Sequence, residues 1–167
     1  MKKFLALVLC LLMAFSMTAA VAEEGALQTI DDMYEGVWVQ FEDGFEIYLP
    51  ADWYEIETTE EWNAKGIFYA AGTEDLSRVC TLAWQPLEAE YTIEQVHAEL
   101  VAVYPDASLV NVNGVGLVAY VDAENNLMTC IALDAAEPGY YMFAFSPADD
   151  VEFQTLASLI ASSIRNF

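Results

Sequence analysis

The chain contains 167 residues, with five basic and 27 acidic side chains, and its formal charge at pH 7 is −22. This balance argues against nucleic-acid binding, which depends on counterion release by clustered Lys and Arg. It argues equally against docking on an anionic membrane surface. Aromatic and branched apolar residues occur along the whole chain, which excludes intrinsic disorder.

The first 22 residues have the three parts of a secretory signal peptide. A Lys-Lys pair precedes an apolar run over residues 4–15, and the small residues Ala20 and Ala22 suit signal peptidase. The run is shorter than the roughly 20 residues that span a bilayer. It also continues past Cys10, where a lipid-modified cysteine would end it. We expect cleavage after Ala22 and a soluble product that is secreted or periplasmic.

The predicted mature chain of 145 residues keeps three basic side chains against 27 acidic ones, a net charge of −24. This length suffices for one domain with a proper core. We expect a flexible acidic lead-in or a short helix over residues 23–36, followed by a single α+β domain over residues 37–167.

Alternating apolar residues predict a β-hairpin with strands over residues 37–41 and 45–49. The two strands keep their apolar side chains on one face only if an odd number of loop residues joins them. A three-residue loop that ends in Gly44, with this glycine in the left-handed conformation, pairs Phe41 with Phe45 and keeps the register.

Further strands are expected where apolar runs are bounded by turn residues. The Asn113-Gly114 pair, typical of a tight hairpin turn, joins two of them. These runs are six in number and cover residues 67–71, 79–85, 109–112, 115–121, 127–133 and 140–145. Together with the two strands of the first hairpin, they give about eight strands.

Two helices are predicted from their capping residues. Thr92 and Gln95 have capping-box spacing at the start of an amphipathic segment. The last helix is expected to begin at Ser146, with this serine as the cap and Pro147 in the first position. Its expected apolar stripe consists of Phe153, Leu156, Ile160, Ile164 and Phe167.

No short catalytic motif occurs in the sequence. His97 is the single histidine and has no partner that the sequence identifies, so we interpret it as a half-buried helix residue rather than a catalytic base. Cys80 and Cys130 lie among apolar strand residues. A disulfide needs adjacent strands, so two core thiols are the preferred interpretation and a bridge is the alternative. The acidic residues match no calcium-loop spacing, so a solvated acidic surface is the preferred interpretation and a calcium site is the alternative. No metal ligand is predicted.

The segment over residues 51–65 combines large aromatic side chains with acids. Such rings near an exposed edge can stack on a sugar or anchor a protein partner. The alternative is a satellite cluster that seals the corner between hairpin and sheet. The candidate binding residues are Asp52, Trp53, Tyr54, Glu55 and Trp62.

The run FEIYLPADW, residues 45–53, resembles the opening of Mog1/PsbP-like domains. The order of the later predicted elements is also similar. The resemblance implies a twisted, mainly antiparallel sheet of about six to eight strands flanked by helices, an α-β-α sandwich. Members of this family are non-enzymatic binding or assembly modules, among them a Ran-binding nuclear import factor, a photosystem II subunit and exported bacterial proteins. No functional residue is carried over from the resemblance.

We therefore expect an exported, non-enzymatic binding or accessory module that uses no cofactor. Its expected partner is an unidentified protein or glycan, and neither a nucleic acid nor, after signal cleavage, a membrane. One alternative is a carbohydrate-binding protein that uses Trp53, Tyr54 and Trp62. The other is a hydrolase of unrecognised type that uses His97 or a carboxylate pair.

Overall fold

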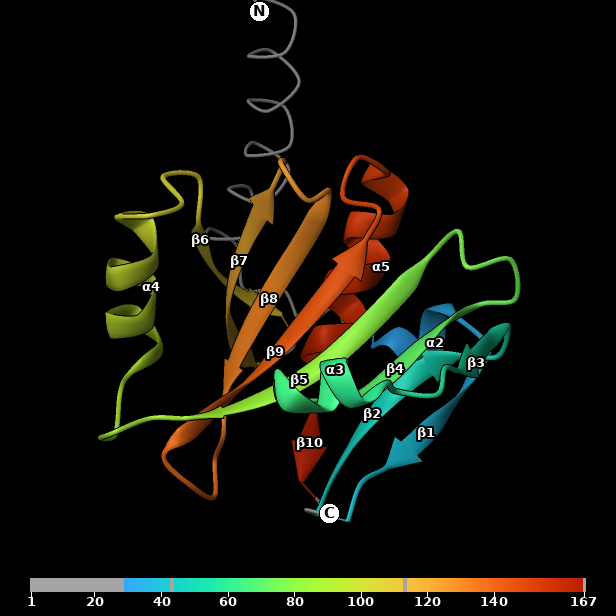
Figure 1. The fold of residues 1–167 in the computed structure, drawn as a ribbon, viewed down its shortest axis with the longest axis horizontal. Helices are drawn as coiled ribbons and strands as arrows, with labels where there is room; N and C mark the ends of the chain where they lie inside the picture. Colours follow the sequence, from blue (N-terminus) through green and yellow to red (C-terminus); the bar gives the residue numbers. More distant parts are fainter. Residues whose placement is uncertain (1–28, 43, 113, 167) are drawn as a thin grey trace, which may run out of the picture.

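The computed structural model describes residues 29–42, 44–112 and 114–166 (Figure 1). The main sheet has seven antiparallel strands in the order β3-β4-β5-β9-β8-β7-β6, and a smaller sheet has the order β1-β2-β10. The predicted signal peptide lies outside the described residues. The strands are β1 (Gly36–Gln40), β2 (Phe45–Pro50), β3 (Trp53–Glu55), β4 (Ile67–Thr73), β5 (Val79–Pro86), β6 (Ser108–Val112), β7 (Val115–Asp122), β8 (Leu127–Leu133), β9 (Gly139–Ser146) and β10 (Arg165–Asn166).

Four helices are described: α2 (Ile30–Met33), α3 (Glu60–Ala64), α4 (Ile93–Val101) and α5 (Val151–Ser162). Neighbouring residues of a strand point to opposite faces of a sheet. On β7, Val118 belongs to the cluster beneath α4, whereas Leu117 belongs to the larger core that includes α5 and β2. The two long helices therefore cover opposite faces of the main sheet (Figure 1). The expected α+β fold, with a mainly antiparallel sheet between helices, is confirmed.

Strand β2 is buried along its whole length. Phe45, Ile47 and Leu49 point into the main core, as the alternating pattern predicts. The opposite face carries Glu46 and Tyr48, which are also buried, at 6 % exposure each. Strands β1 and β10 flank β2 on its two edges. The sequence pattern indicated a strand buried on one face, whereas the small sheet buries both.

The predicted hairpin register is confirmed. Gln40 pairs with Glu46, and the Phe41 amide donates a hydrogen bond of 2.9 Å to the Phe45 carbonyl. Gly44 has a φ of +85°, as the three-residue loop requires. Residue 43, at the centre of this loop, lies outside the described residues.

The start of the last helix was predicted wrongly. Ser146 is the final residue of β9, and α5 begins five residues later at Val151. Its cap is Asp150, whose carboxylate accepts a 3.0 Å hydrogen bond from the Phe153 amide. The intervening chain is held to the β7–β8 turn, because the Ala148 amide donates to Asn126. By contrast, the capping box of α4 at Thr92 forms as predicted.

The far end of the last helix also differs from the predicted stripe. Helix α5 ends at Ser162, and the chain then extends so that Arg165 pairs with Glu46 on β2. Ile164 lies beyond the helix but still packs against the core. Phe167 lies outside the described residues.

The folded domain begins before residue 37. Ile30, in α2, is only 2 % exposed and belongs to the main core. The Tyr34 carbonyl accepts a 2.9 Å hydrogen bond from the Tyr48 hydroxyl on β2. Part of the segment over residues 23–36 is therefore the short helix that we expected as the alternative to a flexible lead-in, and it packs against the folded domain.

Replacement of Gly44 by valine tests the hairpin loop. No atom lies within 4 Å of the position that a Cβ would occupy, so the cost arises from backbone strain at positive φ alone. We expect a loss of about 1 kcal/mol in the free energy of unfolding, measured by chemical denaturation. An unchanged free energy would contradict the assigned loop conformation.

Candidate functional site

Strand β3 divides the predicted aromatic site between core and surface. This three-residue strand lies at the edge of the main sheet, and its side chains alternate across the sheet. Trp53 points inward, is 9 % exposed, and its ring lies 6.0 Å from that of Phe153 on α5. Tyr54 points outward and is 58 % exposed. Trp53 is therefore a core residue, and Tyr54 is the exposed ring of this strand.

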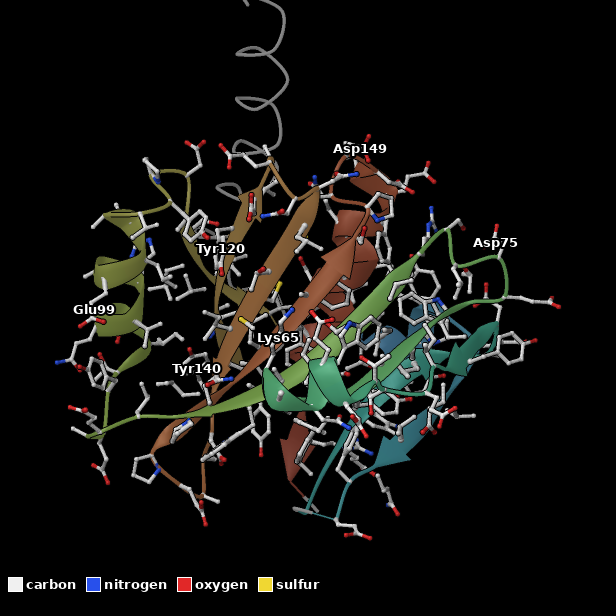
Figure 2. All side chains as sticks on the ribbon, in the orientation of Figure 1. Lys65, Asp75, Glu99, Tyr120, Tyr140 and Asp149 are labelled. Carbon is white, nitrogen blue, oxygen red and sulfur yellow. The ribbon has the colours of Figure 1, made fainter. Side chains whose placement is uncertain are left out.

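A shallow, open hollow of about 420 Å³ lies beside Tyr54. The antiparallel pairing of β3 with β4 sets Trp53 opposite Thr73, which brings the turn after β4 next to residues 52–54. Figure 2 shows Asp75 on this projecting turn. The hollow is lined by Asp52, Tyr54, Thr73, Glu74 and Asp75.

Two of the predicted site residues, Asp52 and Tyr54, thus meet in the hollow. The turn residues Thr73, Glu74 and Asp75 were not predicted, because only the β3–β4 pairing brings them there. Glu55 is exposed on β3, and Trp62 is half-buried on α3, where its amide donates to the Thr59 hydroxyl that caps the helix. Neither contributes to the lining of the hollow.

Asp75 is fixed within its own turn. Its Oδ1 accepts hydrogen bonds from the Ser77 hydroxyl at 2.7 Å, the Ser77 amide at 3.0 Å and the Thr73 hydroxyl at 2.7 Å. These donors, those of Ser77 first, lower the pKa of Asp75 to about 2 because they stabilise the charged form. The turn therefore presents a permanently ionised carboxylate beside Tyr54 at neutral pH.

Each basic side chain of the described chain is already paired with a carboxylate. Lys65 contacts Glu61 at 2.7 Å on the exposed surface of α3. Arg78 contacts Asp150, the cap of α5, at 2.6 Å, and Arg165 contacts Glu46 at 2.7 Å. Because the acids far outnumber these three cations, the remaining surface charge is overwhelmingly negative.

His97 makes its hydrogen bond within the fold. The His97 Nε2 lies 3.1 Å from the Ala107 carbonyl oxygen, in a hydrogen bond that ties α4 to the segment preceding β6. No group of three His, Cys, Asp or Glu side chains able to hold a metal ion occurs among the described residues.

Cys80 and Cys130, the two cysteines of the described residues, are free thiols in the core. Cys80 on β5 lies opposite Phe145, and Cys130 on β8 lies opposite Phe143. Strand β9 therefore separates them. Two strand spacings amount to about 10 Å, which exceeds the Cα separation that a disulfide permits. Burial raises the pKa of Cys130 to about 12 and that of Cys80 further.

Comparisons with solved structures agree with this architecture. The solution structure of cyanobacterial PsbP (CyanoP) from Synechocystis sp. PCC 6803 matches with a TM-score of 0.54 and 12 % identity, over 86 % of this chain and all of that one. A crystal structure from Bacteroides thetaiotaomicron matches with a TM-score of 0.51 and 12 % identity, over 74 % of this chain and 45 % of that one. The chain therefore has a PsbP-like fold.

No family model and no curated protein matches the sequence. In the part of the chain that the structure describes, no helix has both the length and the apolar character needed to cross a membrane.

Alanine substitutions at the neighbouring residues Trp53 and Tyr54 should have opposite consequences. Trp53→Ala removes a buried ring and should cost about 3–5 kcal/mol in the free energy of unfolding. Tyr54→Ala removes an exposed ring and should change it by less than about 0.5 kcal/mol. Thermal and chemical denaturation of the two variants would measure both values. Equal losses would place Tyr54 in the core as well.

Proposed function

We propose that the chain is an exported, non-catalytic accessory module that binds a cationic polypeptide at the hollow beside Tyr54. The observation that carries this proposal is the pairing of all three basic side chains within the domain. The unpaired charges that the described domain offers to a partner are therefore carboxylates. At the hollow those carboxylates surround an exposed aromatic ring, which is a common anchor at protein interfaces.

The charge distribution favours this partner on physical grounds. A strongly negative field attracts cationic partners from a distance and repels anionic ones. At short range, the Tyr54 ring can receive a Lys or Arg side chain on its face while Asp52 and Glu74 offer acceptors. The resulting association should weaken as salt screens the field.

A carbohydrate partner is the weaker candidate. Sugar stacking was expected to use three rings, but Trp53 is buried and Trp62 is half-buried outside the hollow. Only Tyr54 remains as an exposed platform there. The interpretation of His97 as a structural residue agrees with its hydrogen bond to the Ala107 carbonyl and supports a non-catalytic role.

Binding to arrayed peptides of graded charge, with a glycan array in parallel, tests the proposed partner class. We expect the mature chain to retain Lys- and Arg-rich peptides and to lose them as salt increases. Tyr54→Ala combined with Asp52→Asn should weaken this binding by at least about tenfold, the cost of a modest hot spot.

Val103→Ala is the matched control, because Val103 is 69 % exposed and lies beyond α4, outside the hollow. This variant should bind as the unaltered chain does. Retention of glycans alone, or equal peptide binding by the control and the double variant, would contradict the proposed site.

Export is tested separately by mass spectrometry of the chain produced in a bacterium with a general secretory pathway. We expect extracytoplasmic protein whose first residue is Glu23, because the residues before it have the pattern of a cleaved signal. Protein that stays in the cytoplasm with its first 22 residues, or that carries a lipid on Cys10, would contradict export as a soluble chain.

A further inference from the structure

The Arg165 side chain lies in a cage formed by strands β1 and β2. Its Nε donates a 2.7 Å hydrogen bond to Glu46 Oε1, and its guanidinium carbon lies 3.4 Å from the centre of the Trp38 ring. Gln40 donates a 3.1 Å hydrogen bond to the second carboxylate oxygen of Glu46. The guanidinium is thus held by two groups, the oriented carboxylate of Glu46 and the aromatic face of Trp38.

The register of the small sheet builds this cage. Gln40 and Arg165 both pair directly with Glu46, from its two sides, so all three side chains emerge on the same face. Trp38 lies two residues before Gln40 and therefore shares that face. Tyr48 supports the indole edge-on, with ring centres 5.2 Å apart, and its hydroxyl is fixed to the Tyr34 carbonyl.

The burial of Glu46 shows that this carboxylate needs a cationic partner. The Glu46 side chain is only 8 % exposed, whereas that of Arg165 is 53 % exposed. Gln40 and Arg165 lower the pKa of Glu46, so its carboxylate is charged at neutral pH. A buried charge without a partner is strongly destabilising. Glu46 therefore belongs to the fixed site, while the arginine is the accessible component.

The geometry selects a guanidinium over an ammonium. A planar guanidinium stacks on an indole while it still donates in its own plane to a carboxylate. An ammonium is a compact charge that retains its hydration more strongly and has no plane to stack. Trp38 and Glu46 use these two properties together.

We propose that Trp38, Gln40 and Glu46 form a binding site for an arginine side chain of a partner polypeptide, and that Arg165 occupies this site within the chain. The inference rests on the proposed cationic partner and assigns it a second contact, away from Tyr54. Strand β10 pairs with β2 over two residues only, so its displacement breaks few backbone contacts. The freed edge of β2 can then accept an extended segment that carries the arginine.

Arg165 makes the site selective through competition. A ligand binds only to the fraction of molecules in which the cage is vacant, so its apparent affinity falls by that fraction. A partner must therefore supply strand pairing or the contact at Tyr54 in addition to its arginine. The same competition by Arg165 disfavours the binding of single arginines from solution to the cage.

The test uses the mature chain with Arg165→Ala, and the probe is the acetylated amide of arginine. We expect Arg165→Ala to melt at a lower temperature than the unaltered chain, and millimolar probe to restore much of the difference. By calorimetry the probe should bind this variant at least about tenfold more tightly than the unaltered chain. The acetylated amide of lysine should restore less.

Two controls isolate the cage. Lys65→Ala removes a cation from an exposed ion pair, with 62 % and 77 % of the two side chains accessible, and its melting temperature should not respond to the probe. Arg165→Ala combined with Glu46→Gln should also be insensitive, because the amide removes the charge that demands the guanidinium. If Arg165→Ala does not fold, Arg165→Lys keeps the charge and is tested in its place.

The proposal would be overturned if the probe raised the melting temperatures of Arg165→Ala and Lys65→Ala equally. It would also be overturned if the probe raised the melting temperature of Arg165→Ala equally with and without Glu46→Gln. The outcome is separable from that of the Tyr54 site. If Arg165→Ala still binds the probe after Tyr54→Ala and Asp52→Asn are added to it, the arginine site is independent of the Tyr54 site. Failure of the unaltered chain to retain basic peptides, with intact probe binding by Arg165→Ala, would overturn the cationic partner while the cage stands.

Discussion

The burial of β2 on both faces is the constraint on which the rest of this structure depends. One face of the strand supplies Phe45 and Ile47 to the core beneath α5. The other face needs a cover of its own, which is provided by Trp38 on β1, Tyr34 directly after α2, and Arg165 on β10. Segments from both ends of the described chain therefore meet on a single strand. Removal of any of them, with no other segment in its place, would expose polar groups or apolar surface of β2 to water.

The electrostatics of the domain are set by its small number of basic side chains. Only three basic side chains face an excess of acids, and each contacts a carboxylate at a structurally informative point: within α3, at the cap of α5, and on β2. The exposed pair on α3 contributes little to stability. The pair on β2 involves a buried carboxylate, which is destabilising unless it is matched. The three cations thus differ in how much their ion pairs matter for stability, a difference that the sequence does not show.

The sequence predicted those features that depend on local chemistry. The hairpin loop at Gly44 follows from side-chain parity, and the capping box at Thr92 follows from spacing. Features that depend on long-range pairing were missed. The cap at Asp150 replaced the expected Ser146 because β9 extends through that residue. The turn at Asp75 joined Tyr54 only through the pairing of β3 with β4, and no local signal in the sequence indicates this contact.

The separation of the two thiols by β9 makes the order of folding and thiol oxidation important. Both are held protonated, because burial raises their pKa values, and the thiolate is the form that attacks a disulfide. In an oxidising compartment the folded domain therefore shields two oxidisable groups that its geometry prevents from joining. The unfolded chain has no such protection, since nothing then keeps Cys80 from Cys130. If the chain folded in such a compartment, completion of the sheet before oxidation would decide whether it reached this structure or was trapped by a cross-link that the structure cannot contain.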